Sequence, residues 1–330
     1  MRKLRYLNIG LFAILLILIT TIFWVRADQL RVEKEINADR QFQLSSFTPE
    51  ISKELVDNTE LVDKTTKLSN FESTAPYAAI YTSDMDEVYS KNSADRIAPA
   101  STTKILTAAT ALTYLKPDDI LTVGDELDLV HPGSSLCYLR KGQKLTLRDA
   151  LIGMLLPSGN DAAYVIATNT ADLMLLNNDL SSGEKVNYFC SLMNNVADSY
   201  GIKDSNFVNP EGWDNPNHYT TVEDLAKITS CAMEFEVIRE IVALSNYTGI
   251  IESGETLRVR NTNPLVQPGN LYYRDNAIGV KTGYTDNAGR CLVGAVSNSD
   301  GEEYIVLAMG CSDLTSRNQA VTDMIDMIEW

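Results

Sequence analysis

Apolar and polar positions follow three successive patterns from residue 76 to the end of the chain. Short apolar runs at 78–82 and 87–90, joined by a Ser-Asp turn, predict a β-hairpin. Apolar residues then recur at helical spacing, which predicts helices over 101–115, 146–155, 162–170, 185–200, 221–233 and 237–244. Runs rich in β-branched residues follow at 277–282, 290–296 and 304–309, before a last amphipathic helix at 316–330. This order predicts an α+β fold, an antiparallel sheet flanked by helices with a large helical insertion.

The first 73 residues have a different character. Residues 7–25 form an apolar run behind a basic amino terminus, which predicts a single membrane-spanning segment whose basic flank stays in the cytoplasm. We expect it to be retained as an anchor, and the alternative is a signal segment cleaved after Ala27. The polar stretch that follows predicts a stalk. The predicted organisation is an anchor or signal segment at 1–26, an extracellular stalk at 27–73 and a folded domain at 74–330.

Composition narrows the possible functions. The formal net charge is −16, and the first 26 residues hold four basic and no acidic residues, so residues 27–330 carry −20. This charge argues against nucleic acid and anionic lipid as partners. The five cysteines show no CxxC spacing, and most or all of them are expected to be buried apolar residues. The two histidines, His131 and His218, form no HExxH motif, so no metal site is predicted.

Three short motifs occur in one order along the chain: Ser101-Thr102-Thr103-Lys104, Ser158-Gly159-Asn160 and Lys281-Thr282-Gly283. They are predicted to lie at the start of a buried helix, at a break between helices and on a strand. S-x-x-K also occurs at residues 182–185, in a charged turn without an apolar framework, whereas K-T-G occurs once. The order and the settings, more than each motif alone, predict that the three act together.

A serine and a lysine in one helical turn are the parts of an activated nucleophile. Neither histidine lies in a motif that supplies a base, so Lys104 is the predicted general base for Ser101. Its amine must be neutral to accept a proton, which requires burial and a nearby positive charge to lower its pKa. We expect Lys281 to supply that charge.

The chain resembles the serine penicillin-binding proteins and β-lactamases, which are recognised by S-x-x-K, S-x-N and K-T-G. It is most similar to the D-alanyl-D-alanine carboxypeptidases of low molecular mass, over about residues 74–330. The resemblance rests on the stretches 99–104, 156–163, 207–210 with Gly212, 218–219, 279–285 and 288–290. It implies a β-lactamase/transpeptidase-like fold, peptidoglycan stem peptides as substrate and β-lactam antibiotics as covalent inhibitors. It also implies a bacterial cell membrane location, with the catalytic domain outside the cytoplasm.

The expected roles follow from the motifs and the resemblance. Ser101 attacks the carbonyl between two D-alanines, and Lys104 takes its proton. Ser158 relays a proton to the leaving D-alanine, and Asn160 orients Lys104 and the substrate amide. The K-T-G motif presents a strand edge to the peptide through Lys281, Thr282 and Gly283. The resemblance places the oxyanion hole at the backbone N–H groups of Ser101 and Tyr284. Water hydrolyses the acyl-enzyme, so no cofactor is expected.

Several alternatives stay open. A β-lactamase needs fast deacylation, and Glu211 does not match the motif of the glutamate that serves it in one class. A non-catalytic penicillin sensor is the second alternative. Ser101 and Asn160 are also candidates for plain helix caps, and His218 is expected to be a loop hydrogen-bonder. The turn at residues 310–313 lacks an arginine that some relatives use for the substrate carboxylate, which leaves Thr282, Lys281, Arg290 and Arg317 as candidates.

Overall fold

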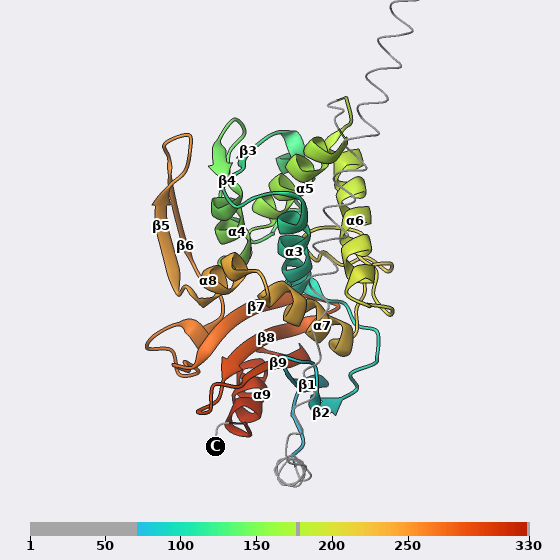
Figure 1. The fold of residues 1–330 in the computed structure, drawn as a ribbon, viewed down its shortest axis with the longest axis vertical. Helices are drawn as coiled ribbons and strands as arrows, with labels where there is room; N and C mark the ends of the chain where they lie inside the picture. The colour runs from blue at the N-terminus through green and yellow to red at the C-terminus, as the bar shows by residue number, and fades with distance from the viewer. Residues whose placement is uncertain (1–70, 176–178, 329–330) are drawn as a thin grey trace, which may run out of the picture. The chain divides into compact units, whose positions relative to one another are not determined.

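The computed structural model describes residues 71–175 and 179–328 of the chain (Figure 1). The predicted membrane segment at 7–25 and nearly all of the predicted stalk lie outside these residues. Within the described ranges, no helix is long and apolar enough to cross a membrane.

Strands from both ends of the folded region build one antiparallel sheet. Its order is β2-β1-β9-β8-β7, and Tyr77 of β1 pairs with Met309 of β9. The strands are β1 (Tyr77–Thr82), β2 (Glu87–Lys91), β7 (Ala277–Thr285), β8 (Gly289–Ser297) and β9 (Glu303–Cys311). The predicted hairpin and the three predicted C-terminal strands are therefore confirmed. Strand β7 forms one edge of the sheet, which becomes important for the site.

The sheet is buried on both faces, because successive side chains of a strand point to opposite sides. Leu292 and Val306 pack against α9 (Leu314–Asp326), whereas Val293 and Leu307 belong to the core shared with the other helices. Figure 1 shows α9 on one side of the sheet and the remaining helices on the other. Each fully buried side chain of this kind contributes about 1.5–3 kcal/mol, so both faces hold β7 and β8 in place.

The helical insertion lies between β2 and β7, as the sequence predicts. Its helices are η1 (Ala100–Thr103), α3 (Lys104–Tyr114), η2 (Asp125–Leu129), α4 (Leu147–Leu155), α5 (Asn160–Leu175), α6 (Ser182–Ser199), α7 (Val222–Met233), α8 (Glu236–Ala243) and η3 (Pro264–Val266). Two small hairpins accompany them, β3 (Ile120–Thr122) with β4 (Lys144–Thr146), and β5 (Asn246–Ile250) with β6 (Thr256–Arg260). The β5–β6 hairpin is not predicted from the sequence.

One boundary differs in a way that concerns the site. The sequence places Ser101 in the first turn of an α-helix, but the α-helix starts at Lys104 and Ser101 lies in the 3₁₀ turn before it. Ala100, directly before Ser101, adopts a left-handed conformation with φ +50°, which cannot belong to a right-handed α-helix.

Candidate active site

The turn that carries Ser101 is held between two other segments of the chain. Ala100 has a φ that non-glycine residues rarely adopt. A Cβ atom on Gly283 of β7 would lie 3.2 Å from the Ser101 nitrogen, and one on Gly212 would lie 1.7 Å from the Ala100 oxygen. Glycine at both positions therefore allows β7 and the loop at 209–218 to approach the Ser101 turn closely.

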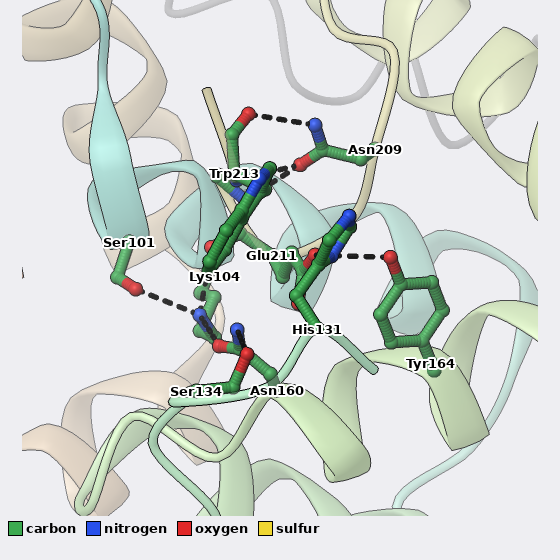
Figure 2. Close-up of polar contacts among 10 residues, drawn as sticks. Ser101, Lys104, His131, Ser134, Asn160, Tyr164, Asn209, Glu211 and Trp213 are labelled. Atoms are coloured by element: carbon green, nitrogen blue, oxygen red, sulfur yellow. Dashed lines mark hydrogen bonds and ion pairs between the residues drawn. The ribbon is translucent and has the colours of Figure 1, made fainter. Parts of the chain in front are cut away.

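Lys104 is fully buried, and its Nζ has three partners (Figure 2). It lies 2.8 Å from Ser101 Oγ, 2.8 Å from Asn160 Oδ1 and 2.7 Å from the Glu211 main-chain oxygen. The two carbonyl oxygens can only accept hydrogen bonds, whereas a hydroxyl can also donate. A neutral amine has two hydrogens and one lone pair, so the carbonyls take both hydrogens and the lone pair faces Ser101. This geometry suits the predicted role of Lys104 as the base for Ser101.

Burial also favours the neutral form of the Lys104 amine. It lowers the pKa of Lys104 to about 8, against the opposing effect of the Glu211 and Asp161 carboxylates. Burial likewise lowers the pKa of Lys281 well below its ordinary value, and the charges of Lys104 and Arg317 lower it further. The sequence predicts that Lys281 lowers the pKa of Lys104, but the main cause at Lys104 is burial and the repulsion between the lysines depresses Lys281.

Asn160 is the first residue of α5 and connects Lys104 to the loop between η2 and β4. Its amide Nδ2 donates to Ser134 Oγ at 3.0 Å, and its backbone N–H donates to the Ser135 oxygen at 2.8 Å. The side chain is thus used by Lys104 and Ser134 and does not serve as the plain helix cap that the sequence left open. Asp161 accepts from the backbone of this same loop, at Cys137 and Leu139, each at 3.0 Å.

Ser158 lies in the turn between α4 and α5, two residues before Asn160. It is buried and has a φ of +67°, again a conformation that is strained for a non-glycine residue. Its hydroxyl has no hydrogen-bond partner among the residues that the structure describes. The structure therefore places Ser158 beside the network but does not join it to Lys104, and its role as a proton relay stays a prediction.

The K-T-G residues lie on β7, the edge strand beside Ser101. Lys281 is buried, and its Nζ donates to the Thr282 oxygen at 2.9 Å, while the Thr282 hydroxyl pairs with that of Thr262 at 2.6 Å. Tyr284 is half exposed, and the Arg290 guanidinium lies 3.6 Å from the centre of its ring. The strand thus faces the site with backbone groups and a hydroxyl.

Arg317, one of the two arginines that the sequence left as candidates for binding a carboxylate, is buried on α9. Its Nε and Nη2 donate to Asn318 Oδ1 at 2.9 and 2.7 Å. Burial lowers its pKa to about 10, and its charge in turn lowers the pKa of Lys281. Arg317 therefore adds positive charge close enough to Lys281 to act on its pKa.

The loop at residues 209–218 is the part of the site that sequence reasoning missed. It lies along α3, where Thr107 Oγ1 donates to the Pro210 oxygen at 2.6 Å and Lys104 donates to the Glu211 oxygen. Asp214 accepts from the Thr285 hydroxyl at 2.6 Å and so ties the loop to the end of β7. The Asn-Pro-Glu-Gly turn was the available signal, but nothing in its pattern shows that its carbonyls face a lysine.

His218, in the same loop, has a structural role as predicted. Its Nδ1 accepts from the Val208 N–H at 3.0 Å, so the hydrogen is on Nε2, which donates to Thr103 Oγ1 at 2.8 Å. Burial and the charge of Lys104 lower the pKa of His218 to about 4, so it stays neutral. All five cysteines lie in the described part of the chain and form no disulfide there. Four of them are buried, as expected.

Comparisons with known proteins agree with this geometry. The family model described as D-alanyl-D-alanine carboxypeptidase, peptidase S11, matches residues 72–312. The D-alanyl-D-alanine carboxypeptidase DacF of Bacillus subtilis is 29% identical over 248 residues, which are 72% of this chain and 58% of that protein. The D-alanyl-D-alanine carboxypeptidase of Streptomyces sp. strain K15 is 31% identical over 250 residues, which are 72% of this chain and 81% of that protein. The chain thus spans little more than half the length of the Bacillus relative.

Solved structures are similar as well. The crystal structure of the Streptomyces K15 DD-transpeptidase is 29% identical, covers 78% of this chain and 98% of its own, and superposes with a TM-score of 0.70. The D-alanyl-D-alanine carboxypeptidase DacD from Francisella tularensis is 24% identical, with a TM-score of 0.65, 78% of this chain and 71% of its own covered. The second likeness shows the fold alone.

Proposed function

Because the chain belongs to the D-alanyl-D-alanine carboxypeptidase family, we propose that it removes the terminal D-alanine from peptidoglycan stem peptides through an acyl-enzyme on Ser101. The observation that carries the proposal is the buried Lys104 amine, whose two carbonyl partners leave its lone pair directed at Ser101 Oγ. A serine and lysine in this relation are the working parts of acyl transfer.

The proposed reaction starts when Lys104 takes the Ser101 proton as Ser101 Oγ bonds to the carbonyl carbon between the two D-alanines. The C–N bond then breaks, and the leaving amine receives a proton, in our proposal through Ser158. The N–H groups of Ser101 and Tyr284 stabilise the oxyanion, and a pair of this kind is worth about 3 kcal/mol per donor. Water then hydrolyses the ester and releases the shortened peptide. No step needs a cofactor.

The place of β7 in the sheet supports the proposed binding of substrate. It is an edge strand, so the backbone groups on its outer side are available to an added strand. We propose that the stem peptide lies along residues 281–284, and that Thr282 and Lys281 hold its terminal carboxylate with Arg317 adding positive charge nearby. β-Lactams, which carry a carboxylate and a reactive carbonyl, acylate Ser101 in the same pose.

We also propose that the domain works outside the cytoplasmic membrane, tethered through residues 7–25. The support is the apolar run with its basic flank and the strongly acidic remainder of the chain. The intact mass of the mature protein tests this: a chain that begins at Asp28 is a cleaved, secreted form and overturns the tether.

The deciding experiment measures D-alanine release from a pentapeptide ending in D-Ala-D-Ala, with the full chain and its Ser101→Ala variant. Labelling by a fluorescent penicillin is measured in parallel. Wild type should release D-alanine and become labelled, and Ser101→Ala should do neither. Labelling of the variant contradicts the nucleophile, labelling of wild type without D-alanine release indicates a penicillin sensor, and sustained penicillin hydrolysis indicates a β-lactamase.

A second candidate is acyl transfer to an amine, because the similar Streptomyces K15 structure is that of a DD-transpeptidase. Both reactions share the acyl-enzyme and differ in whether water or an amine attacks it. Adding an amine acceptor such as glycylglycine to the same assay separates them: a carboxypeptidase yields the tetrapeptide, and a transpeptidase yields the longer product.

A further inference from the structure

A carboxyl group that the proposed reaction does not use lies buried beside the base. The main-chain oxygen of Glu211 accepts a hydrogen bond from Lys104 Nζ, and its side chain is buried in the same wall of the site (Figure 2). Glutamate is almost never fully buried without a partner for its charge. Packing alone therefore does not explain why the Glu211 carboxyl is buried.

The carboxyl is fixed in orientation by residues from three different segments. Oε1 accepts from the hydroxyl of Tyr164, on α5, at 2.9 Å and from Nδ1 of His131, in the loop between η2 and β4, at 3.3 Å. The His131 ring stacks on Trp213 at 4.3 Å between centroids, with an interplanar angle of 5°. Trp213 lies two residues after Glu211 in the same loop, so the stack holds the His131 ring in place beside the carboxyl. Figure 2 shows His131 and Tyr164 on the side of Glu211 away from Ser101.

The second oxygen of this carboxyl, Oε2, is buried and has no hydrogen-bond partner among the described residues. An unpartnered buried carboxylate oxygen is costly unless a positive charge compensates it. The titratable and charged groups that interact with Lys104 are Glu211, Asp161, Lys281 and His218. His218 is neutral and Lys281 is repulsive, and Asp161 already accepts from the backbone of Cys137 and Leu139.

When Lys104 takes the Ser101 proton, a neutral buried amine becomes a buried ammonium. Its carbonyl partners are dipoles, and they compensate a full charge less well than a carboxylate does. We propose that Glu211 is a positioning residue for Lys104: its main-chain oxygen fixes the amine, and its carboxylate balances the charge that the amine acquires. This inference rests on the proposed roles of Ser101 and Lys104.

The test is the pH dependence of the acylation rate constant with a fluorescent penicillin, in the full chain. Glu211→Gln keeps the shape and removes the charge. Without the carboxylate the ammonium is less stable, so the pH at which acylation reaches half its plateau should fall by about one unit or more. Glu211→Asp keeps the charge and should stay within a few tenths of a unit of wild type.

Glu126 gives a matched control. It is also a buried glutamate, it accepts from the Gly124 N–H at 2.6 Å, and burial raises its pKa as it does that of Glu211. It does not contribute to the pKa of Lys104. Glu126→Gln should therefore lower the free energy of unfolding and leave the pH at which acylation reaches half its plateau as in wild type.

The inference is overturned if the pH at which acylation reaches half its plateau is unchanged in Glu211→Gln. It is also overturned if this pH shifts equally in Glu126→Gln. If Glu211→Gln does not fold, the double variant Tyr164→Phe/His131→Phe is measured instead. It removes both donors to the carboxyl and raises the pKa of the carboxyl, so the pH at half-plateau should again fall. An unchanged pH at half-plateau in this variant also overturns the inference. Failure of the proposed function looks different, because wild type itself would then not be acylated.

Discussion

The close approach of Gly212 to the Ser101 turn predicts what one added methyl group does to the site. In Gly212→Ala the Cβ atom would lie 1.7 Å from the Ala100 oxygen and 2.9 Å from the Ser101 nitrogen. Both are backbone atoms, so no flexible side chain can move aside. The loop at 209–218 must therefore separate from the Ser101 turn.

The loss in the free energy of unfolding of Gly212→Ala has two contributions. Gly212 has a φ of +92°, which costs alanine about 1–2 kcal/mol. Separation to ordinary contact distance breaks the 2.7 Å bond from Lys104 to the Glu211 oxygen, which costs about 1–3 kcal/mol in a buried setting. A total near 3 kcal/mol lowers the melting temperature by roughly 6–12 °C. Displacement of the base by an ångström or more lowers acylation by about 100-fold.

Thermal unfolding and acylation by a fluorescent penicillin measure these two effects. Gly142→Ala is the matched control, since Gly142 has a φ of +88° with no atom within 4 Å of the added Cβ. It carries the backbone strain without the clash, so it should lose roughly 2–4 °C for about 1 kcal/mol and acylate normally. Equal losses in the two variants, or normal acylation in Gly212→Ala, would refute the view that the close approach positions the base.

Three further predictions concern residues around the base. The acylation rate constant of wild type should rise with pH and level off above about 8, the pKa of Lys104, because the neutral fraction grows as the pH rises; Lys104→Arg, which stays charged, should show no labelling at any pH. Thr107→Val removes the buried bond to the Pro210 oxygen and should lower the free energy of unfolding by about 1–2 kcal/mol, measured by denaturant titration. Asp161→Asn directs an amide at backbone N–H groups and should lower the free energy of unfolding by about 2–3 kcal/mol and reduce acylation. An unchanged free energy of unfolding would contradict its role in holding the loop between η2 and β4.

The elements that the sequence predicts are those with a local signal. The strands β7, β8 and β9 carry β-branched runs between turn residues, and α3 shows helical spacing. The β5–β6 hairpin was missed although Thr256–Arg260 alternates between exposed and buried positions. Gly249 within β5 weakens the signal of the partner strand, so the pair does not stand out as a hairpin.

In the site, too, the residues with a local sequence signal were predicted and the others were not. Ser101, Lys104 and Asn160 were predicted because their motifs are short and ordered. The burial of Glu211 was not, because glutamate is ordinarily exposed and its partners are remote: His131 lies 80 residues away and Tyr164 lies 47 residues away. The 3₁₀ turn at Ser101 is of the same kind, since the conformation of Ala100 depends on packing against distant glycines.

Burial of Lys104 separates a catalytic interpretation from a structural one. A pKa lowered from 10.5 to about 8 means that the folded chain forgoes about 3 kcal/mol when this lysine is charged. A serine that only capped a helix would need no lysine beside it, and a lysine that only packed would keep its ammonium in water. The chain instead buries the amine, gives two of its hydrogens to carbonyl oxygens from segments 56 and 107 residues away, and leaves the third direction to a hydroxyl. Such an arrangement destabilises the charged amine before reaction and still offers acceptors once it is protonated, which is what reversible proton transfer from Ser101 requires.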